Sequence, residues 1–296
     1  MKVVVFGGSG FIGSHVCDVL RERGIEPIIF DRFPHVQMAP VARVFYGDIK
    51  DKEAVLEAVG LSDGAINLAG ILGTSETVNN PYPSVDVNII GGLNFLEACR
   101  HTKKRGVQIT VGNHFMNNSY AITKTATERF ALMYNKEHAT RVAVVRGLNA
   151  YGPRQKHKPV RKIIPNFVIR ALRGDPIEIY GKGESIMDMI FVKDVAEILV
   201  RALLDEHNCY DKIFEAGTGV ETTVNEIANM VNKITDNKAG VKHLPMRQGE
   251  PEQSIVLGSP STLLPLKMSG GNLKTLFEGL KETVDWYKNN YNLDEI

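Results

Sequence analysis

Short apolar runs alternate with amphipathic segments along the first two thirds of the chain. The runs are rich in β-branched residues and occupy 2–6, 26–30, 42–46, 64–68, 107–111 and 141–145. The segments between them carry apolar positions at helical spacing, at 11–23, 52–59, 84–104 and 119–138. This alternation predicts βαβ units and a parallel sheet that is buried on both faces, which is a doubly wound α/β fold of the Rossmann type.

The alternation becomes less regular beyond about residue 150. Gly, Pro and basic residues cluster at 151–165 and 240–272, whereas 189–204 and 212–217 again have the patterns of a helix and a strand. We therefore expect a nucleotide-binding domain over residues 1–150, to which 189–217 returns. A smaller, loop-rich substrate lobe would comprise 151–188 and 218–296.

Composition and charge are those of an ordinary globular protein. Of the 296 residues, 43% are hydrophobic and 23% are charged, and the net charge is +1. This balance favours neither nucleic acid nor a membrane surface as a partner, and no apolar run approaches the roughly 18 residues that span a bilayer. No signal peptide is visible, and Cys17, Cys99 and Cys209 are few and far apart. We expect a cytoplasmic protein with core thiols, without disulfides or a metal site.

A glycine-rich turn follows the first predicted strand and opens the first helix. In this turn, Gly7 permits a tight bend, Gly10 allows close approach to a pyrophosphate, and Gly13 lets the helix pack on the strand. Asp31 ends the next strand, where a carboxylate can bind the ribose hydroxyls and repel a 2′-phosphate. The motif predicts a site for NAD rather than NADP, although the neighbouring Arg32 could accept a 2′-phosphate. The alternative is a glycine turn that only starts a helix.

The next two predicted strands also end in candidate ligand contacts. Asp48 could bond an adenine amine while Ile49 covers the ring, and a helix N-cap is the alternative for Asp48. Leu68, Ala69 and Gly70 follow the fourth strand. Ligands of such sheets bind beyond the carboxyl ends of the strands, so these residues are expected at the cofactor site.

Tyr120 and Lys124 are four residues apart and share one face of the helix predicted at 119–138. A tyrosine with a pKa near 10 is a poor base at neutral pH, but a neighbouring ammonium favours the phenolate and lowers that pKa. The pair is therefore a candidate general base. The alternative for Tyr120 is an aromatic side chain that packs on the core.

These features resemble the extended short-chain dehydrogenases/reductases, and within them the NAD-dependent nucleotide-sugar epimerase/dehydratase family. The resemblance extends over nearly the whole chain, through GGSGFIGSH, Asp31, GDI, NLAG, Asn88, YAITK, RGLNAYGPRQ, IYGKGESIMDMIFVKDVAEI and MRQGEP. It implies NAD as cofactor, a nucleotide-diphosphate sugar as substrate, Tyr120 as the proton acceptor, and Lys124 as a ligand of the nicotinamide ribose. It implies cofactor contacts from Gly7, Gly10, Phe11, Ile12, Gly13, Asp31, Arg32, Asp48, Ile49, Leu68, Ala69, Gly70, Asn88, Tyr120 and Lys124. It also implies a homodimer that pairs through 84–104 and 119–138.

The sequence departs from that family beside the tyrosine. Family members usually end the fifth strand with Ser-Ser or Ser-Thr, whereas this strand ends Thr110-Val111-Gly112-Asn113-His114, close to Tyr120. By register Gly112 or Asn113 takes the place of the hydroxyl, and Thr110 is the next candidate. His114 could also donate a hydrogen bond, and a plain turn is the alternative for all three residues of GNH.

The acids of the dehydratase members are missing as well. No carboxylate lies between Val107 and Tyr120, and Glu76 is the nearest acid expected to face the substrate. This favours epimerisation at a carbinol or simple reduction over dehydration and decarboxylation.

The resemblance also implies contacts to the substrate diphosphate from Asn149 and Arg247. The family arginine before Asp188 is replaced by Met187. A basic run offers compensation, and we expect Arg154 and Arg161 of it to bind substrate together with Glu76; a solvated loop is the alternative. The run comprises Arg154, Lys156, His157, Lys158, Arg161 and Lys162.

The leading interpretation is an NAD-dependent nucleotide-sugar epimerase, most similar to UDP-glucose 4-epimerase, that works through a 4-keto sugar. The alternatives are a nucleotide-sugar reductase, dehydrogenase or dehydratase. From another class, a catalytically silent NAD-binding regulatory protein is favoured by the missing hydroxyl and disfavoured by Tyr120 and Lys124.

Overall fold

The computed structural model describes residues 1–33, 43–204 and 209–291. Residue 42 of the strand expected at 42–46, and 292–296 at the end of the expected substrate lobe, lie outside the described residues. Within these ranges, no helix combines the length and the apolar character needed to cross a membrane.

A seven-stranded parallel sheet forms the centre of the molecule, which confirms the predicted fold class. The strand order is β11-β6-β5-β4-β1-β2-β3, so the order reverses between β1 and β4, where such sheets bind nucleotides. The strands are β1 (Lys2–Phe6), β2 (Glu26–Asp31), β3 (Arg43–Tyr46), β4 (Gly64–Asn67), β5 (Arg105–Val111), β6 (Val142–Gly147) and β11 (Ile213–Ala216).

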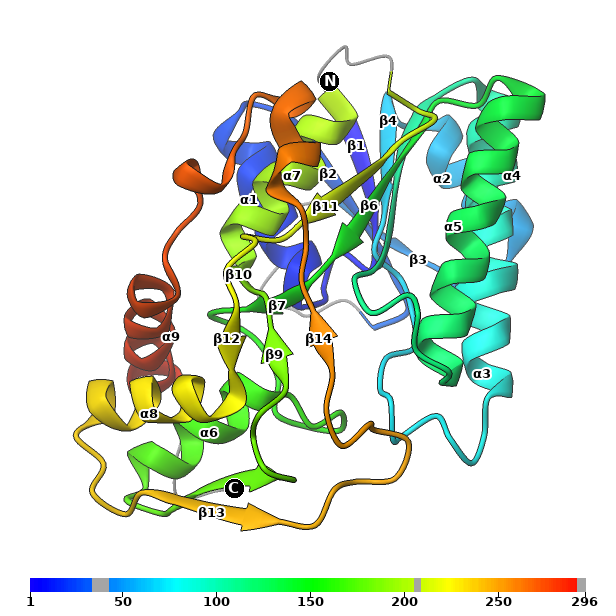
Figure 1. Cartoon of the computed structure of the whole chain (residues 1–296). Helices are drawn as coiled ribbons and strands as arrows, with labels where there is room; N and C mark the ends of the chain where they lie inside the picture. Colours follow the sequence, from blue (N-terminus) through cyan, green and yellow to red (C-terminus); the bar gives the residue numbers. More distant parts are fainter. Residues whose placement is uncertain (34–42, 205–208, 292–296) are drawn as a thin grey trace.

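Helices cover both faces of the sheet (Figure 1). On one face lie α1 (Phe11–Glu22) and α7 (Val192–Leu204), and on the other α2 (Lys52–Gly60), α4 (Gly91–Thr102) and α5 (Ser119–His138). Side chains of β1 alternate between the layers: Val3 and Val5 belong to the first core, Val4 and Phe6 to the second, and all four are fully buried. A strand buried on both faces explains the uninterrupted apolar run in the sequence.

The structure differs from two of the predicted helices. The segment predicted as one helix at 84–104 begins as α3 (Tyr82–Ser84), continues as a π-helical segment (Val85–Ile90) and ends as α4. The helix expected at 189–204 begins only at Val192, because Met189–Phe191 forms a short strand, β10, that pairs with β7 (Asn149–Tyr151). Apolar runs this short do not distinguish the two states.

A third core lies beside the sheet and contains the fully buried side chains of Tyr151, Phe191 and Tyr287. It is built on α6 (Ile163–Leu172), α8 (Val224–Thr235) and α9 (Leu276–Asn290), which give this part more regular structure than the sequence pattern indicated. The remaining strands are β8 (Ile177–Tyr180), β9 (Ile186–Met187), β12 (Thr222–Thr223), β13 (Val241–Leu244) and β14 (Ile255–Val256), followed by two 3₁₀ segments (Pro260–Leu266 and Gly270–Asn272). The division into two domains stays a prediction.

Candidate active site

The glycine turn between β1 and α1 brings the helix unusually close to the strand. Gly7 has a φ of 76°, in the region that favours glycine, and a Cβ atom on Gly13 would lie 2.2 Å from the carbonyl oxygen of Gly7. Gly10 precedes the helix and offers no capping side chain, so the first N–H groups of α1 stay available to an anion. Phe11 and Ile12, at the start of α1, line the adjoining cavity.

Asp31 lies against this turn. Its Oδ2 accepts a hydrogen bond from the backbone N–H of Ser9 at 3.2 Å. The Arg32 side chain points instead toward Asp48, with 3.8 Å between Nη1 and Oδ2. A carboxylate therefore lies beside the glycine turn, and the neighbouring guanidinium is directed toward another carboxylate.

The residues after β3 differ in part from expectation. Asp48 is not a helix N-cap; Asp51 caps α2 by accepting hydrogen bonds from the N–H groups of Glu53 and Ala54. Ile49 is only 4% exposed and packs against Gly91 in the core, so its side chain is poorly placed to cover an adenine ring. Burial of an apolar side chain at this turn depends on α4, which no local pattern reveals.

Asn88 holds the loop after β4 against α5. Its Oδ1 accepts a hydrogen bond from Ile71 N at 2.9 Å, and its Nδ2 donates to Ile71 O at 3.2 Å and to Thr123 Oγ1 at 2.9 Å. The loop itself, which includes Leu68 and Ala69, approaches Gly7 closely. At Gly70 an added Cβ would lie 3.0 Å from Asn88 Oδ1 and 3.4 Å from Lys124 Nζ. The turn after β1, the loop after β4 and Lys124 thus converge on one place.

Tyr120 and Lys124 lie on the inward face of α5, whose first turn is capped by Asn118. The Tyr120 side chain is half-buried and lines a cavity of about 400 Å³, and Lys124 is 3% exposed. Loss of water raises the pKa of the Tyr120 phenol to about 12 and lowers the pKa of the Lys124 ammonium to about 8. Burial therefore favours the neutral form of both groups.

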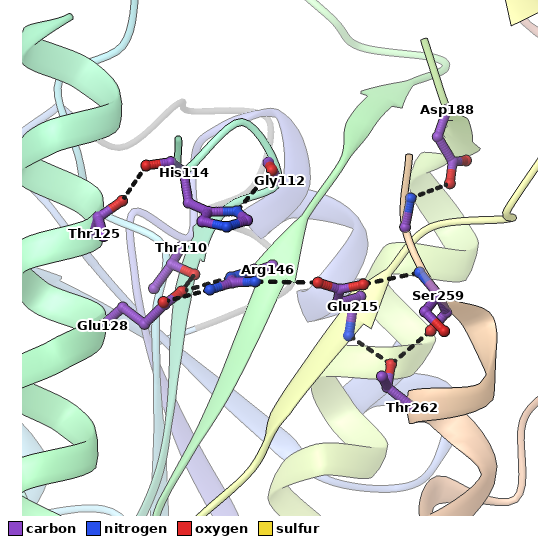
Figure 2. Close-up of polar contacts among 11 residues, drawn as sticks. Thr110, Gly112, His114, Thr125, Glu128, Arg146, Asp188, Glu215, Ser259 and Thr262 are labelled. Carbon is purple, nitrogen blue, oxygen red and sulfur yellow. Dashed lines mark hydrogen bonds and ion pairs between the residues drawn. The ribbon is translucent and has the colours of Figure 1, made fainter. Parts of the chain in front are cut away.

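Thr110 does not reach the cavity. Its hydroxyl is buried beneath α5 and donates to Glu128 Oε2 at 3.0 Å (Figure 2). The prediction of Thr110 as a catalytic hydroxyl is therefore wrong, because two residues before the strand end its side chain faces the helix layer rather than the ligand edge.

The strand end itself is filled by a neighbour. A Cβ atom on Gly112 would lie 2.1 Å from Leu148 Cδ1, so Leu148 occupies the space of any side chain at this position. Asn113 does line the cavity, together with Tyr120, and its Nδ2 contacts only the sulfur of Met116, at 3.4 Å. Of the candidates to replace the missing hydroxyl that carry a polar side chain, Asn113 lines the same cavity as Tyr120, whereas Thr110 and His114 do not.

His114 belongs to a plain turn. Its Nδ1 is 3.1 Å from the carbonyl oxygen of Gly112, and its own carbonyl oxygen accepts a hydrogen bond from Thr125 Oγ1 at 3.3 Å (Figure 2). The ring is thus turned back on its own loop and does not line the cavity.

The opposite wall of the cavity carries most of the expected substrate contacts. It includes Glu76, Asn149, Arg161 and Arg247. Arg154 is absent from this wall: its guanidinium pairs with Asp18 of α1 at 2.7 Å, so its assignment to the substrate is wrong. The φ of Arg154, 68°, lies in the left-handed region, and local sequence gives no sign of where such a residue directs its side chain.

Two further cations and an aromatic ring also lie on this wall; of these, the sequence analysis named only Lys162, as a member of the basic run. Lys162 and Arg170 line the cavity, and burial lowers the pKa of Lys162. The guanidinium carbons of Arg161 and Arg247 lie 5.5 and 5.3 Å from the centre of the Tyr180 ring. The sequence analysis predicted neither β8 nor the contact of its last residue, Tyr180, with two arginines.

The wall is positively charged but partly neutralised. Arg161 pairs with Glu178 at 3.3 Å, and Arg247 pairs with Glu250. The Nε of Arg247 is buried and has no hydrogen-bond partner among the described residues. A buried donor without a partner is costly, so an anionic ligand at this position would be stabilised.

Comparison with known proteins identifies the family of the chain. Residues 3–217 match the model of the NAD dependent epimerase/dehydratase family. A UDP-N-acetyl-alpha-D-glucosaminuronate decarboxylase of Bacillus cytotoxicus is 28% identical over 97% of this chain and 98% of its own.

Two solved structures, each 28% identical, have nearly the same fold. A UDP-glucose 4-epimerase of Thermotoga maritima with UDP-glucose superposes with a TM-score of 0.90, over 99% of this chain and 100% of the other. A UDP-glucose 4-epimerase of Thermus thermophilus with NAD gives a TM-score of 0.87, over 98% and 100%.

Proposed function

Because the chain belongs to the NAD-dependent epimerase/dehydratase family, we propose that it is an NAD-dependent epimerase of a nucleotide-diphosphate sugar, of the UDP-glucose 4-epimerase type. The observation that carries the choice of reaction is the wall around Tyr120. The loop before Tyr120 contributes Gly112, Asn113 and Met116 to the cavity, and residues 112–118 contain no carboxylate. Reactions that break a carbon–hydrogen bond beside a keto group need such a base.

The residues of the site fit NAD. Only glycine fits at Gly13, the free N–H groups of α1 suit a pyrophosphate, and the Asp31 carboxylate suits the ribose hydroxyls. Lys124 would hold the nicotinamide ribose. NAD, when bound, accepts a hydride from a sugar carbon and returns it.

Tyr120 would take the proton of the sugar hydroxyl and later return it. Its pKa of about 12 without ligands is too high for that task at neutral pH, so the phenol needs positive charge nearby. Lys124, on the same helical face, supplies such a charge whenever it is protonated. The Asn113 amide would donate a hydrogen bond to the same sugar oxygen, in place of a hydroxyl.

The cationic wall would hold the diphosphate. Arg161, Lys162 and Arg247 offer guanidinium and ammonium donors, and Asn149 of the same wall is a further candidate contact. Glu178 and Glu250 would exchange their arginine partners for the more highly charged phosphates. If only the diphosphate is anchored, the sugar ring can rotate within the cavity and present its other face to the cofactor, which inversion at C4 requires.

Turnover in D₂O tests the proposal. Purified protein with NAD is incubated with UDP-glucose or UDP-galactose, and the product is analysed by mass spectrometry and NMR. Inversion at C4 returns the same hydride, so we expect an isomerised sugar nucleotide without deuterium on carbon. Tyr120→Phe, which removes only the proton-accepting oxygen, should abolish turnover and keep NAD binding.

The same experiment identifies the competing reactions. Stoichiometric deuterium on carbon would contradict C4 epimerisation. It would direct attention to Glu76, a carboxylate that lines the cavity together with Leu72 and Gly73 of the same loop. Loss of carbon dioxide from a uronate substrate would identify a decarboxylase. Consumption of NADH with a keto sugar would identify a reductase.

A further inference from the structure

A series of polar contacts leads from Glu128 on the catalytic helix α5 through Arg146 and Glu215 to Ser259 (Figure 2). Asp188 continues the series to Asn149. The charged centre of the series consists of Glu128, Arg146 and Glu215, which we call the ion-pair bridge. None of the three lines the cavity. Any effect of the bridge on the site must therefore pass through the residues that it holds.

The sheet places the bridge in register. Thr110 of β5 is opposite Arg146 of β6, and Arg146 is opposite Glu215 of β11. Paired residues of neighbouring strands point to the same face of a sheet. These three side chains consequently form one row across the sheet, beneath α5.

Glu128 connects that row to the catalytic helix. It lies one helical turn beyond Lys124 and two beyond Tyr120, and its side chain is 2% exposed. Its carboxylate accepts hydrogen bonds from Arg146 Nε at 2.9 Å, from Arg146 Nη2 at 2.7 Å and from Thr110 Oγ1 at 3.0 Å. The two-pronged contact fixes both distance and orientation between α5 and β6.

Glu215 connects the row to the other side of the site. Its Oε1 is 3.1 Å from Arg146 Nη1, and its Oε2 accepts a hydrogen bond from Ser259 N at 2.8 Å. Thr262 accepts a hydrogen bond from Glu215 N at 2.9 Å and donates to Ser259 O at 2.8 Å. The turn at 259–262 is thereby held to β11.

The contacts continue from that turn to Asn149. Asp188, which is fully buried, accepts a hydrogen bond from Gly258 N at 3.0 Å, and its backbone carbonyl accepts from both N and Nδ2 of Asn149 at 3.1 Å. Asp188 also accepts from the hydroxyl and N–H of Thr218. Each buried oxygen of Asp188 thus has partners, and Asn149 is oriented by the same residue that anchors the turn.

One guanidinium serves two carboxylates in this bridge. The hydrogen bonds to Glu128 hold the pKa of the Arg146 guanidinium above its usual value, and a guanidinium stays charged in proteins in any case. Breaking one partner of a buried pair leaves an uncompensated charge that the surrounding structure must move to accommodate. The movement would reach α5 from Glu128, and Asn149 from Glu215.

We propose that Arg146 is a positioning residue that couples the helix carrying Tyr120 and Lys124 to Asn149 on the substrate wall. The two carboxylates have separate tasks. Glu128 sets the placement of the catalytic pair, and Glu215 sets the placement of the substrate wall. This inference rests on the proposed function for its kinetic consequences.

Isosteric variants test the separation. Glu128→Gln should lower kcat about 10- to 100-fold, since small misplacements of catalytic groups have effects of that size, with KM for the nucleotide sugar nearly unchanged. Glu215→Gln should raise that KM about 5- to 50-fold with kcat nearly unchanged. Arg146→Lys keeps the charge but loses the fork, so it should show both effects, and it replaces Glu128→Gln if that variant does not fold.

Glu197→Gln is the matched control. Glu197 also pairs with two arginines, Arg23 and Arg201, but it does so on the α1–α7 side of the sheet. We expect its kcat and KM to equal those of the wild type. Equal changes of kcat and KM in all bridge variants, or a loss of folded protein with unchanged kinetics per folded molecule, would overturn the proposal.

Calorimetry separates this inference from the proposed reaction. Glu128→Gln should weaken the binding of NAD at least about fivefold and leave UDP unchanged, and Glu215→Gln should do the reverse. If the wild type binds NAD and UDP but converts no nucleotide sugar, the proposed function fails. The opposite affinity losses would then still support the bridge, and unchanged affinities in both variants would refute it.

Discussion

At the scale of the residue, a single side chain, Leu148, limits which residues the end of β5 can carry. It fills the space above Gly112 so completely that a Cβ atom there would lie 2.1 Å from its Cδ1. The strand end therefore cannot carry a serine without a change at Leu148. With no hydroxyl at Gly112, Asn113 is the next residue along the chain that brings a polar side chain to the cavity.

Two variants separate the roles of Asn113 and Thr110. Asn113→Ala should lower kcat about tenfold or more, because it removes a hydrogen-bond donor from the transition state. Thr110→Val should lower the free energy of unfolding by about 1 kcal/mol, because it leaves one lone pair of Glu128 without its donor. Steady-state kinetics and urea unfolding measure the two effects. An Asn113→Ala enzyme with wild-type kcat would show that Tyr120 acts without an amide partner.

Lys124 makes a pH-dependent contribution to stability. Burial lowers its pKa to about 8 from an unfolded value near 10.5, so the unfolded chain binds more protons between these values. The unfolding free energy of ligand-free wild type should therefore rise, relative to Lys124→Met, as the pH increases through 8. Between pH 7 and 9.5 the gain should be about 2 kcal/mol.

Urea unfolding of both proteins across that range measures the difference, in which the titration of the remaining groups cancels. The range stops below pH 10 because Tyr120, whose pKa is raised to about 12, acts in the opposite direction above it. Parallel curves for the two proteins would show that Lys124 is solvated in the folded state.

The segment 82–102 shows, at the scale of the element, where sequence patterns lose detail. Its apolar positions predict one helix, yet residues Val85–Ile90 are π-helical. The wider turn carries Asn88, which bonds Ile71 and Thr123 and so ties the loop after β4 to α5. Such bulges occur at functional sites, and they depend on partners distant in sequence.

The elements that a local pattern does encode were predicted well. The glycine turn, the acid at the end of β2 and the helical spacing of Tyr120 and Lys124 depend on neighbours in sequence, and the structure has β1, α1, β2 and α5 close to their expected bounds. Arg154 and Ile49 were misjudged for the opposite reason. Asp18 directs the first and Gly91 buries the second, and neither neighbour is close in sequence.

The contact between the end of β2 and the glycine turn is expected to determine the preference for NAD over NADP. Asp31 lies against Ser9, and Arg32 is directed toward Asp48, so a 2′-phosphate would meet a carboxylate first. Wild type should bind NAD more tightly than NADP in calorimetric titrations. Asp31→Ala should narrow that preference at least about tenfold, since a charged group near the ligand is removed. If the wild type bound both cofactors with equal affinity, Asp31 would not determine the preference, and Arg32 would be inferred to accept the 2′-phosphate.

The site belongs to the molecule as a whole, because no single core builds it. Tyr120 comes from the layer of α4 and α5, Phe11 from the layer of α1 and α7, and Arg161 and Arg247 from segments around the third core. A sequence pattern predicts each layer from its own periodicity. Which cations face the cavity depends on how the third core docks, and this explains why Arg170 was not predicted to line it.

The outer surface of the α4–α5 layer predicts assembly. Apolar side chains are exposed on it: Val85 is 37% exposed, Ile90 45%, Ile122 55% and Met133 38%. A run of apolar groups on two adjacent helices is typical of an interface between subunits. We therefore expect the homodimer that the family resemblance implies, paired through these helices.

Light scattering after size exclusion tests that expectation. Wild type should have the mass of a dimer, and Ile122→Glu should shift it to monomer, because an isologous interface would bring two carboxylates together. Leu264→Glu, at a site 61% exposed on another surface, should leave the mass unchanged. A monomeric wild type, or a dimer that survives Ile122→Glu, would contradict this interface. Ile122 faces outward only two residues from Tyr120, so a dimer built here would hold the catalytic helix from the side opposite the ion-pair bridge.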